Sequence, residues 1–561
     1  MIRSYLRASE ALRTNLSNST VTNPHLIDKT VFDYVIVGAG SAGCVLANRL
    51  SEDGKRTVLS IEAGPKDSSW KIRMPAALMY NLCDDTYNWY YHTIPQKNMN
   101  NRVFYWPRGR VWGGSSSLNA MAYVRGHKND YDSWKGGWNY EDVLPYFKKA
   151  QCHELAKPND YYRGSTGPLH VSCGKLNNPL YEAWIQAGID AGLPYTDDMN
   201  GEQQEGVGKM DMTIRNGERW SAADAYLKPA LKRKNVFAVT NCLVNRVLFE
   251  GKRAVGVEFL VDRKHKVSVR ARKEIILSGG AINSPQLLLL SGIGPTEHLK
   301  EHGIEVKQDL PGVGQNLQDH LEMYVQYSCK ENITLYSYQW KFPHVMIRAG
   351  AEWFLTKSGP CASSHLEVGG FAKTDDSVSH PNVQWHFLPS TVVDHGRKMG
   401  DRHAFQAHAG TMRPLSRGSL KLRSKNPFDH PIIDANYLKE EFDLVELREA
   451  LKYTRRIFQQ KSFDSFRGEE LLPGKHIDSD KKIDDFIRNK ADTAYHPCST
   501  CKMGDDSSSV VDFNCKVHGI EGLRVVDSSI FPSMISGNLN APTIMLAEKA
   551  SDHILGKLNY I

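Results

Sequence analysis

The sequence predicts an α/β fold built around a Rossmann-type dinucleotide-binding unit, and three observations lead to this prediction. A short apolar stretch rich in β-branched residues, 32–37, runs directly into the glycine-rich turn of residues 38–43, GAGSAG. Residues with helical spacing follow that turn. A second strand-like stretch, 56–61, then ends at Glu62. Strand, glycine-rich turn, helix, strand and acid within about 30 residues form the βαβ pattern that binds dinucleotides.

Each glycine of this turn has its own physical role in that pattern. Gly38 allows the tight turn, and Gly40 lets the backbone approach a pyrophosphate. Gly43 lets the helix pack close to the strand, and the helix N-terminus offers free N–H groups to the phosphates. Glu62 is placed to accept hydrogen bonds from the ribose hydroxyls of the adenosine half.

Composition sets outer limits on the class of protein. The chain has 561 residues, of which 41% are apolar and 24% are charged, as in ordinary globular proteins. This excludes collagen, a disordered chain and a coiled coil. No apolar run reaches about 18 residues, so we expect no transmembrane helix. The net charge of +7 is spread along the chain without a basic block, so we expect no nucleic-acid partner. Ten cysteines are sparse for this length and favour a reducing compartment.

The amino-terminal residues have the composition of a targeting segment. Arg3, Arg7 and Arg13 are basic, Glu10 is the only acid among residues 1–23, and serine and threonine are frequent. An amphipathic, arginine-rich and acid-poor segment is typical of a mitochondrial transit peptide, whereas a secretory signal needs an apolar run that is missing here. We therefore predict a transit peptide over residues 1–28 and a mitochondrial protein. The alternative is a polar tail.

Five further motifs are spread over the chain in a fixed order. They are PRGRVWGGSSSLN (107–119), GGAINSPQLLLLSGIG (279–294), PGVGQNLQDH (311–320), YHPCSTCKMG (495–504) and GNLN (537–540). Together with the βαβ unit they resemble the glucose–methanol–choline (GMC) oxidoreductase family, a group of FAD-dependent alcohol oxidases and dehydrogenases. The resemblance covers about residues 32–555.

The resemblance implies an α/β architecture in which a discontinuous, Rossmann-type FAD-binding domain carries an inserted α+β substrate-binding domain with a mixed sheet flanked by helices. Local patterns agree with it. Residues 236–277 contain several strand-like stretches, and residues 439–460 have the periodicity of a helix. The domain ranges that we expect are 32–160, 220–325 and 490–561 for the FAD domain, and 161–219 and 326–489 for the substrate domain.

The same resemblance implies where the FAD lies. Two glycines and three serines in the loop 113–117 present small side chains and free N–H groups to an anion or a flat ring. Some relatives join FAD covalently to a histidine a few residues before this loop. We align that place with Trp106 and therefore expect non-covalent FAD. Besides the residues of the βαβ unit, the FAD-binding candidates are Gly113, Gly114, Ser115, Asn119, Val244 (through its backbone, at the adenine), Asp527 and Asn538.

The family reaction moves a hydride from an alcohol carbon to flavin N5, and it needs a base because the hydroxyl proton must leave as well. A neutral imidazole suits that role near neutral pH. His496 matches the family's histidine, and Asn540 matches the His or Asn that follows some forty residues later. An asparagine cannot take the proton, but it can orient the alcohol oxygen or stabilise an alkoxide. The resemblance thus implies His496 and Asn540 as the catalytic pair.

The motifs are most similar to those of choline-oxidising members of the family. A trimethylammonium group offers no N–H, so aromatic faces and a carboxylate must hold it. Glu367 occupies the stretch where such relatives carry a cation-binding glutamate, and His386 is a candidate second histidine of the site. Four aromatic residues are candidates for the cation cage, with core packing as the alternative for each: Trp89, Tyr90, Tyr91 and Trp340.

The resemblance therefore implies oxidation of choline to betaine aldehyde, the first step of glycine betaine synthesis, with the aldehyde hydrate as a second potential substrate. It also implies a quinone-linked electron acceptor and a peripheral contact with the inner mitochondrial membrane. Two alternatives stay open, namely an enzyme acting on glucose or another uncharged alcohol and a non-catalytic FAD-binding protein. Cys498 and Cys501 form a CxxC, for which packing is favoured over a redox or metal role, and we predict no metal site.

Overall fold

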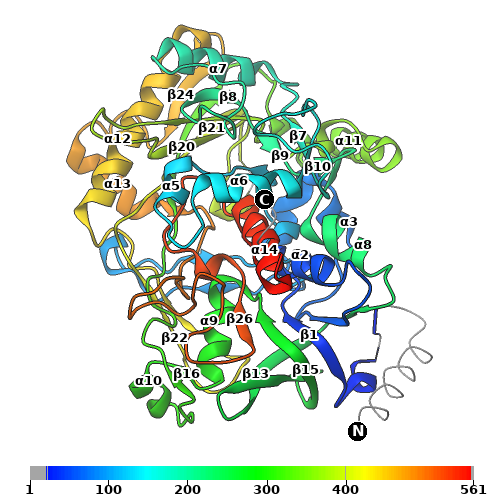
Figure 1. Ribbon diagram of the computed structural model, residues 1–561. Coiled ribbons are helices and arrows are strands. Elements are labelled where there is room, and N and C mark those ends of the chain that lie inside the picture. The colour runs from blue at the N-terminus through cyan, green and yellow to red at the C-terminus, as the bar shows by residue number, and fades with distance from the viewer. Residues whose placement is uncertain (1–19, 22, 399, 558–561) are drawn as a thin grey trace.

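A seven-stranded sheet forms the lower half of the molecule (Figure 1). Strands β12, β2, β1, β15 and β26 run parallel, and β14 and β13 continue the sheet as an antiparallel meander from β15. The computed structural model describes residues 20–21, 23–398 and 400–557. The bounds of these strands are β1 Val31–Val37, β2 Val58–Ile61, β12 Val236–Val239, β13 Cys242–Glu250, β14 Arg253–Val261, β15 His265–Leu277 and β26 Leu523–Val525.

The predicted βαβ unit is present. β1 is buried from Phe32 to Val37, as expected of an inner parallel strand. Helix α2 (Ser41–Leu50) follows after a glycine N-cap, Gly40, and β2 then pairs with β1 in parallel. The strand-like stretches expected between 236 and 277 are β12, β14 and the end of β15, and the helix expected over 439–460 is α12 (Glu441–Phe458).

A second seven-stranded sheet forms the upper half, and every pairing in it is antiparallel. Its order is β24-β18-β21-β20-β19-β8, with β25 pairing to β18. Helices α12 and α7 (Pro179–Asp190) pack against it. The bounds are β8 Gly206–Lys209, β18 Leu321–Cys329, β19 Val368–Ala372, β20 Val383–Leu388, β21 Ala404–Thr411, β24 Arg467–Leu472 and β25 Asp492–Thr493.

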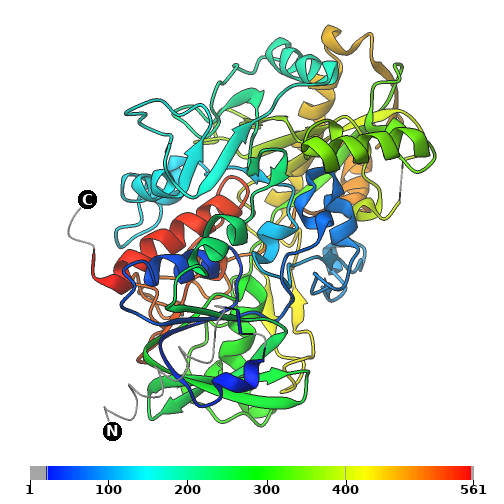
Figure 2. The ribbon, with the colours of Figure 1, turned by 90° about the vertical axis from the view of Figure 1, so that its right-hand side faces the viewer.

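The carboxy-terminal helix α14 (Asn540–Leu555), red in Figure 1, lies in the middle of the molecule between the two sheets, and Figure 2 shows the same arrangement from the side. It packs against α2 and against α6 (Tyr140–Ala150). Its residues from Ala541 to Asp552 are buried. The other helices are α3 Trp70–Arg73, α4 Leu78–Leu82, α5 Lys128–Asp132, α8 Lys228–Ala230, α9 Gly280–Leu290, α10 Thr296–Glu301, α11 Pro343–Thr356 and α13 Asp480–Lys490.

The smaller strands pair in short sheets between these elements. A four-stranded sheet has the order β5-β9-β7-β6, and the described residues also form four two-stranded sheets, β3-β4, β10-β11, β16-β17 and β22-β23. Their bounds are β3 Tyr91–His92, β4 Tyr105–Trp106, β5 Ala122–Tyr123, β6 Gln151–His153, β7 Leu169–Cys173, β9 Asp211–Met212, β10 Ile214–Arg215, β11 Glu218–Arg219, β16 Ile293–Gly294, β17 Gln308–Asp309, β22 Ser419–Lys421 and β23 Ile432–Asp434.

The first sheet follows the predicted domain ranges closely, whereas the second sheet crosses one of their boundaries. Apart from Val31, the first residue of β1, the strands of the first sheet fall within the ranges expected for the FAD domain. In the second sheet, β18 crosses the expected boundary at residue 325, and β25 lies inside the last FAD-domain range. The exact division of the chain stays a prediction.

The predicted transit peptide lies mostly outside the described residues, but its last part does not. The N–H of Val21 donates to the carbonyl of Ala238 in β12 over 3.0 Å. Val21 is 3% exposed and Ile27 is fully buried. The carboxylate of Asp28 accepts the N–H of Ser268 in β15. Residues 20–21 and 23–28 therefore belong to the folded domain.

Candidate active site

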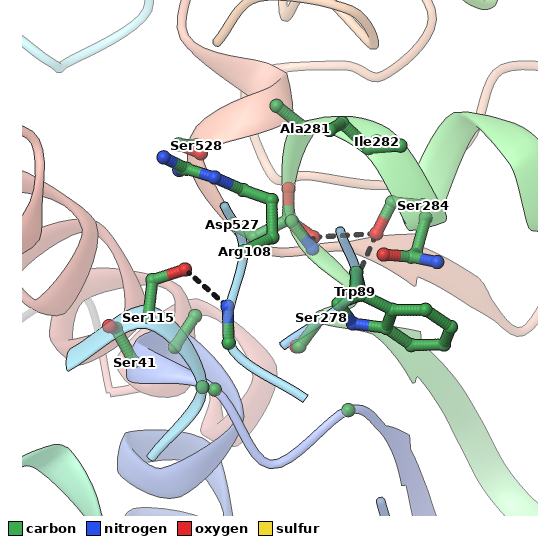
Figure 3. Close-up of a pocket in the computed structure, with 18 of the residues that line it drawn as sticks. Ser41, Trp89, Arg108, Ser115, Ser278, Ala281, Ile282, Ser284, Asp527 and Ser528 are labelled. Carbon is green, nitrogen blue, oxygen red and sulfur yellow. Dashed lines mark hydrogen bonds between the residues drawn. The ribbon is translucent and has the colours of Figure 1, made fainter. Parts of the chain in front are cut away.

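A cavity opens where the carboxyl ends of β1, β2 and β15 meet α9, the loop 107–122 and the start of α14 (Figure 3). This is where open α/β sheets bind their ligands. Most of the predicted site residues line it: Gly38, Gly40, Glu62, Gly114, Ser115, Asn119, Val244, His496, Asp527, Asn538 and Asn540. Gly43, Gly113, Glu367 and His386 are not among the lining residues.

Two glycine-rich loops meet at the floor of the cavity. Gly38 has a φ of +98°, and a Cβ there would lie 2.5 Å from the carbonyl oxygen of Ser278. Gly114 has a φ of +52°, and its Cβ would lie 2.7 Å from Cα of Gly40. A Cβ on Gly43 would lie 2.0 Å from the carbonyl oxygen of Gly38, so α2 touches the turn directly. A larger side chain at any of these positions would fill the cradle or push its walls apart.

The loop 113–119 is tied to the first turn and to a buried arginine. The N–H of Gly113 donates to the carbonyl of Ala39 over 2.7 Å. Ser115 accepts the N–H of Gly109 through its hydroxyl oxygen, as the dashed line in Figure 3 shows. Oδ1 of Asn119 accepts Nη1–H of Arg219, a side chain that is 2% exposed. These bonds place Ser115 and Asn119 as parts of the cavity wall.

Glu62 and Val244 line the cavity beside the ends of β2 and β13. The Glu62 carboxylate accepts the N–H groups of Ala39 and Gly64, each over 2.9 Å. Burial raises the pKa of Glu62 to about 7. Val244 belongs to β13, the last strand in the order of the first sheet, so that one edge of this strand is unpaired in the sheet. The ladder between β13 and β14 also shifts register directly after Val244.

Ser278, at the end of β15 beside the Gly38 turn, carries a polar atom without a partner in the described part of the chain. The hydroxyl of Ser278 is buried and has no hydrogen-bond partner among the described residues. Nearby, Asp527 accepts the N–H of Gly280 and the hydroxyl of Ser284, and these bonds hold the start of α9 (Figure 3). The glycine cradle, the helix N-terminus, the carboxylate of Glu62 and the free Ser278 hydroxyl together suit a bound dinucleotide.

Trp106 does not line the cavity. It is 1% exposed and its ring packs against Tyr437. Trp106, from which we predicted non-covalent FAD, is therefore not at the cavity wall. The non-covalent attachment of FAD stays a prediction.

The CxxC pair is part of the core. Cys498 and Cys501 are both fully buried and both are free thiols. Burial raises the pKa of Cys498 to about 12, so this thiol stays protonated at neutral pH. The pair shows the burial expected of packing residues.

His496 lies at the centre of a hydrogen-bonded row of side chains. Nδ2 of Asn538 donates to Nε2 of His496 over 3.1 Å, and Nδ1 of His496 lies 3.0 Å from Nδ1 of His320. Asn540 is elsewhere: its Oδ1 accepts the hydroxyl of Ser41, the first residue of α2. The structure therefore brings Asn538 to His496, whereas Asn540 faces the start of the helix that follows the glycine turn.

His496 is neutral at physiological pH. Burial lowers its pKa well below the ordinary value, and the positive charges that His320, Arg108 and His386 can carry lower it further. Arg108 lines the cavity and donates to the carbonyl of Tyr495 over 2.6 Å. A neutral imidazole in a cavity can accept a proton, which is the property a general base needs.

The second sheet turns one face toward Asn538. Oδ1 of Asn538 accepts Nε2–H of Gln384 and lies 3.3 Å from Nε2 of His386. Gln384 in β20 is opposite Gly410 in β21, which is opposite Glu322 in β18. Directly opposite residues of antiparallel strands point to the same face. Gln384, His386 and Glu322 therefore share the face that looks toward Asn538.

Glu322 is a buried carboxylate on that face. It is 7% exposed, and its Oε1 lies 3.0 Å from Nδ1 of His408. Its negative charge raises the pKa of His386, although burial outweighs this effect and lowers the pKa of His386 to about 4. The face thus carries one acid close to the two histidines of β20 and β21.

Glu367 is held by a different set of groups. Its carboxylate accepts the N–H of Leu176 over 2.7 Å and the hydroxyl of Ser363 over 2.6 Å. It is 2% exposed and directly precedes β19. Both of its oxygens are thus used to tie the loop 174–176 to the loop 363–367.

The candidate cage residues separate into different environments. Trp89 lines the cavity and stacks on Tyr91, with ring centroids 5.8 Å apart. Tyr90 packs against Tyr105, and Trp340 is 63% exposed. Of the four, only Trp89 lines the cavity.

His320 and Glu322 are site residues that were not predicted from the sequence. Both belong to the segment QDHLE, 318–322, which enters β18. A histidine and an acid two residues apart at the start of a strand point to the same side. This spacing, at the end of a motif that was already recognised, is the signal that could have found them.

Comparison with known proteins matches most of the chain to one family. The family model described as GMC oxidoreductase matches residues 32–322 in its amino-terminal part and 414–547 in its carboxy-terminal part. The chain is 58% identical over 544 residues to choline dehydrogenase, mitochondrial, of Mus musculus, with 94% of this chain and 90% of the relative covered. It is 51% identical over 531 residues to the oxygen-dependent choline dehydrogenase of Brucella anthropi, with 94% and 96% covered.

Solved structures agree in fold. Pyridoxine 4-oxidase from Mesorbium loti superposes with a TM-score of 0.84 at 34% identity, covering 93% of this chain and 98% of that one. Formate oxidase of Aspergillus oryzae RIB40, whose description mentions FAD modification, superposes with a TM-score of 0.89 at 27% identity, covering 95% and 99%.

Proposed function

Because the chain belongs to the GMC oxidoreductase family, we propose that it is an FAD-dependent alcohol dehydrogenase that oxidises choline to betaine aldehyde. The observation that carries this proposal is the position of neutral His496. It lies between a dinucleotide cradle and a sheet face that bears a buried carboxylate. The identity of 51–58% to choline dehydrogenases over 94% of the chain supports the choice of substrate.

The cofactor is FAD, and when bound it supplies the acceptor for the hydride of the alcohol carbon. The residues that would hold it are those of the two glycine loops, with Glu62 and Val244 at the adenosine end and Asp527 and Ser278 along α9. The protein's own part is to orient the alcohol and to move its hydroxyl proton.

His496 and Asn538 do this as a pair. An alcohol that enters between them donates its proton to Nε2 of His496 and accepts a hydrogen bond from Nδ2 of Asn538, the two atoms that now face each other over 3.1 Å. Asn538 thus takes the orienting role that the sequence analysis gave to Asn540, and Asn540 takes a place on the cofactor side. His386 fixes Asn538 from behind, since Nε2 of His386 lies 3.3 Å from its Oδ1.

Glu322 is the carboxylate that we assign to the trimethylammonium group, in place of Glu367. Glu322 shares a sheet face with the residues that hold Asn538, whereas both oxygens of Glu367 are bonded to a neighbouring loop. A buried carboxylate balances a cation that cannot donate an N–H bond. Trp89 is the aromatic candidate at the cavity wall.

Anaerobic mixing of the FAD-loaded protein with alcohols tests the function. We expect choline to bleach the flavin absorption at about 450 nm, a property of the cofactor, and glucose to leave it unchanged. Bleaching by glucose alone would favour the uncharged-alcohol alternative. If no alcohol of a broad panel bleaches the flavin, the protein is a non-catalytic flavoprotein and the proposal is wrong.

The location and the electron acceptor form a second part of the proposal. We place the protein in mitochondria, supported by the composition of residues 1–23 and by the mitochondrial relatives of mouse and human. We also propose a quinone-linked acceptor. One relative is named oxygen-dependent, so the reoxidation rate of the reduced enzyme with oxygen and with a soluble quinone analogue decides between the acceptors.

A peripheral membrane contact fits one surface. Within the part of the chain that the structure describes, no helix is both long and apolar enough to cross a membrane. Helix α11 nevertheless exposes Ile347, Phe354 and Leu355, whose spacing puts them on one side of the helix, and Trp70 packs on Phe354. We call these four residues the α11 patch. Arg348 is exposed next to it and suits anionic headgroups.

Vesicle co-sedimentation tests this contact. The change Leu355→Asp should reduce binding to vesicles that contain an anionic lipid. Val103→Asp is the matched control because Val103 is 53% exposed and its neighbour Arg102 bonds the end of α13, far from α11 in Figure 1. If both variants bind the vesicles equally, the α11 patch is not the membrane contact.

A further inference from the structure

His320 is the last residue of the motif PGVGQNLQDH, 311–320, and is not explained by cofactor or substrate binding. It is fully buried, and its two ring nitrogens face two different partners. Nε2 lies 2.9 Å from the carbonyl oxygen of Met412, just after β21, and Nδ1 lies 3.0 Å from Nδ1 of His496. We propose that His320 is a positioning residue that fixes the tautomer of His496, so that Nε2 of His496 is the free base facing the substrate. This inference rests on the proposed function of His496.

The carbonyl of Met412 determines where His320 carries its proton. A carbonyl oxygen can only accept a hydrogen bond, so the nitrogen that faces it, Nε2 of His320, must carry a hydrogen. In a neutral imidazole the other nitrogen then has a lone pair and no hydrogen. Nδ1 of His320 is therefore an acceptor.

The acceptor on His320 in turn determines the proton on His496. The two Nδ1 atoms are 3.0 Å apart, so one must donate to the other. Since Nδ1 of His320 is the acceptor, Nδ1 of His496 carries the hydrogen and donates. The opposite tautomer of His496 would place two lone pairs against each other in a buried site, at the cost of an unsatisfied hydrogen bond.

Both rings are neutral, so each carries one N–H and one lone pair. Burial lowers the pKa of His320 to about 4 and lowers that of His496 well below its ordinary value. With its proton on Nδ1, neutral His496 presents a lone pair at Nε2. That is the atom to which Nδ2 of Asn538 donates, and Asn538 is itself oriented because its Oδ1 accepts from Gln384.

The residue before His320 holds the same histidine by its backbone. Oδ1 of Asp319 accepts the N–H of His496 over 2.8 Å, and Oδ2 of Asp319 accepts the hydroxyl of Thr493 over 2.6 Å. Consecutive side chains of one segment thus hold the main chain and the ring of His496. The carboxylate of Asp319 can hold the main chain of His496, because it only has to accept a hydrogen bond. The imidazole of His496 requires a neighbour that both accepts from His496 and donates to Met412.

Two substitutions at His320 separate these two functions. In His320→Asn the amide oxygen can take the place of Nδ1 and keep an acceptor for His496. In His320→Gln the amide nitrogen can take the place of Nε2 and keep the bond to Met412, while the acceptor for His496 is lost. Both variants remove the imidazole, so a purely structural role would affect them alike.

The readout is the ¹⁵N spectrum of histidine-labelled, FAD-loaded enzyme, in which the signals of His496 are identified by their loss in His496→Gln. We expect a protonated Nδ1 and a free Nε2 on His496 in the wild type and in His320→Asn. In His320→Gln we expect the opposite tautomer or a mixture. The value of kcat/KM should then fall at least about 100-fold in His320→Gln, since a wrong tautomer costs up to about 10⁴-fold in a catalytic histidine, and much less in His320→Asn.

Three results would overturn the inference. They are a free Nδ1 on His496 in the wild type, an unchanged tautomer in His320→Gln, and equal losses of kcat/KM in the two variants with unchanged tautomers. If His320→Gln does not retain FAD, the wild-type spectrum and that of His320→Asn still decide. Failure of the proposed function is a separate result, because a His496→Gln variant with full turnover would refute the base while the spectrum still reports the tautomer.

Discussion

Asn538 donates a hydrogen bond from Nδ2 to Nε2 of His496 over 3.1 Å, although the two residues are 42 positions apart. Asn540, two residues later and already at the start of α14, faces Ser41 instead. On this contact we propose Asn538, and not Asn540, as the asparagine that works with the base.

The two asparagines are expected to differ in which step they affect. Removal of a donor that stabilises a developing oxyanion costs about 10²–10³ in kcat, so Asn538→Ala should lower the rate of flavin reduction by that factor while FAD stays bound. Asn540→Ala should weaken FAD binding and leave the reduction rate of the loaded enzyme within a few-fold of wild type. Stopped-flow reduction and FAD titration measure the two effects. If Asn540→Ala lowers the reduction rate and Asn538→Ala weakens FAD binding, then Asn540 belongs to the catalytic pair.

His496 should set the acid limb of the pH profile. Its pKa is held well below the ordinary histidine value, chiefly by burial, so it is the free base throughout the neutral range. The value of kcat/KM should therefore stay level as the pH falls to 6.5 and decrease only below it. His496→Ala should lower kcat by about 10²–10⁴, the usual contribution of a general base. A wild-type acid limb centred at or above pH 6.5 would contradict this.

Glu322 and Glu367 make a matched pair of carboxylates. Loss of the buried partner of a charge costs at least about 2 kcal/mol, or roughly 30-fold in affinity, so Glu322→Gln should raise KM for choline by this factor. The uncharged isostere 3,3-dimethylbutan-1-ol should be affected little. Glu367→Gln should leave KM for choline near the wild-type value and lower the melting temperature, because it disturbs the bonds to Leu176 and Ser363. Similar KM values for the wild type and Glu322→Gln would exclude the ion pair.

Glu62 makes the stability of the apoprotein depend on pH with a definite sign. Burial raises its pKa to about 7, so the folded state holds this proton more tightly than the unfolded chain does. Below the ordinary glutamate pKa, Glu62 is protonated in both states and its titration does not change the free energy of unfolding. As the pH rises from there through 7, the wild type should lose up to about 3 kcal/mol relative to Glu62→Gln. Urea unfolding of both apoproteins from pH 4 to pH 8 measures the difference, and a constant difference would contradict the prediction.

The folded residues after Thr20 limit where a targeting segment can be removed. Burial of one valine or isoleucine side chain contributes about 1.5–3 kcal/mol. A chain that starts at Lys29 lacks buried Val21 and Ile27 and should melt at a clearly lower temperature than one that starts at Thr20. The amino-terminal sequence of the protein isolated from mitochondria should begin at or before residue 20. A mature protein that begins at residue 29 and is fully stable would contradict the packing.

The sequence predicted the local parts of this protein well. The glycines and Glu62 of the βαβ unit, the strands from 236 to 277 and the helix over 439–460 follow from patterns within about 30 residues. Such patterns report local backbone requirements, such as a tight turn at Gly38 or a buried parallel strand. The recognised motifs also placed His496 and the second glycine loop at one cavity.

Contacts between distant segments could be known only from the tertiary structure. The sequence could not distinguish Asn538 from Asn540, because the choice depends on how the loop before α14 meets His496 and the second sheet. Nor could it show that Glu322 shares the sheet face toward Asn538, since this depends on the register of β18, β21 and β20. The proton on His496 depends on a carbonyl in a third segment, at Met412. Residue types and spacing determine which chemistry the chain can support, whereas the packing of strands far apart in the sequence decides which side chains share the site.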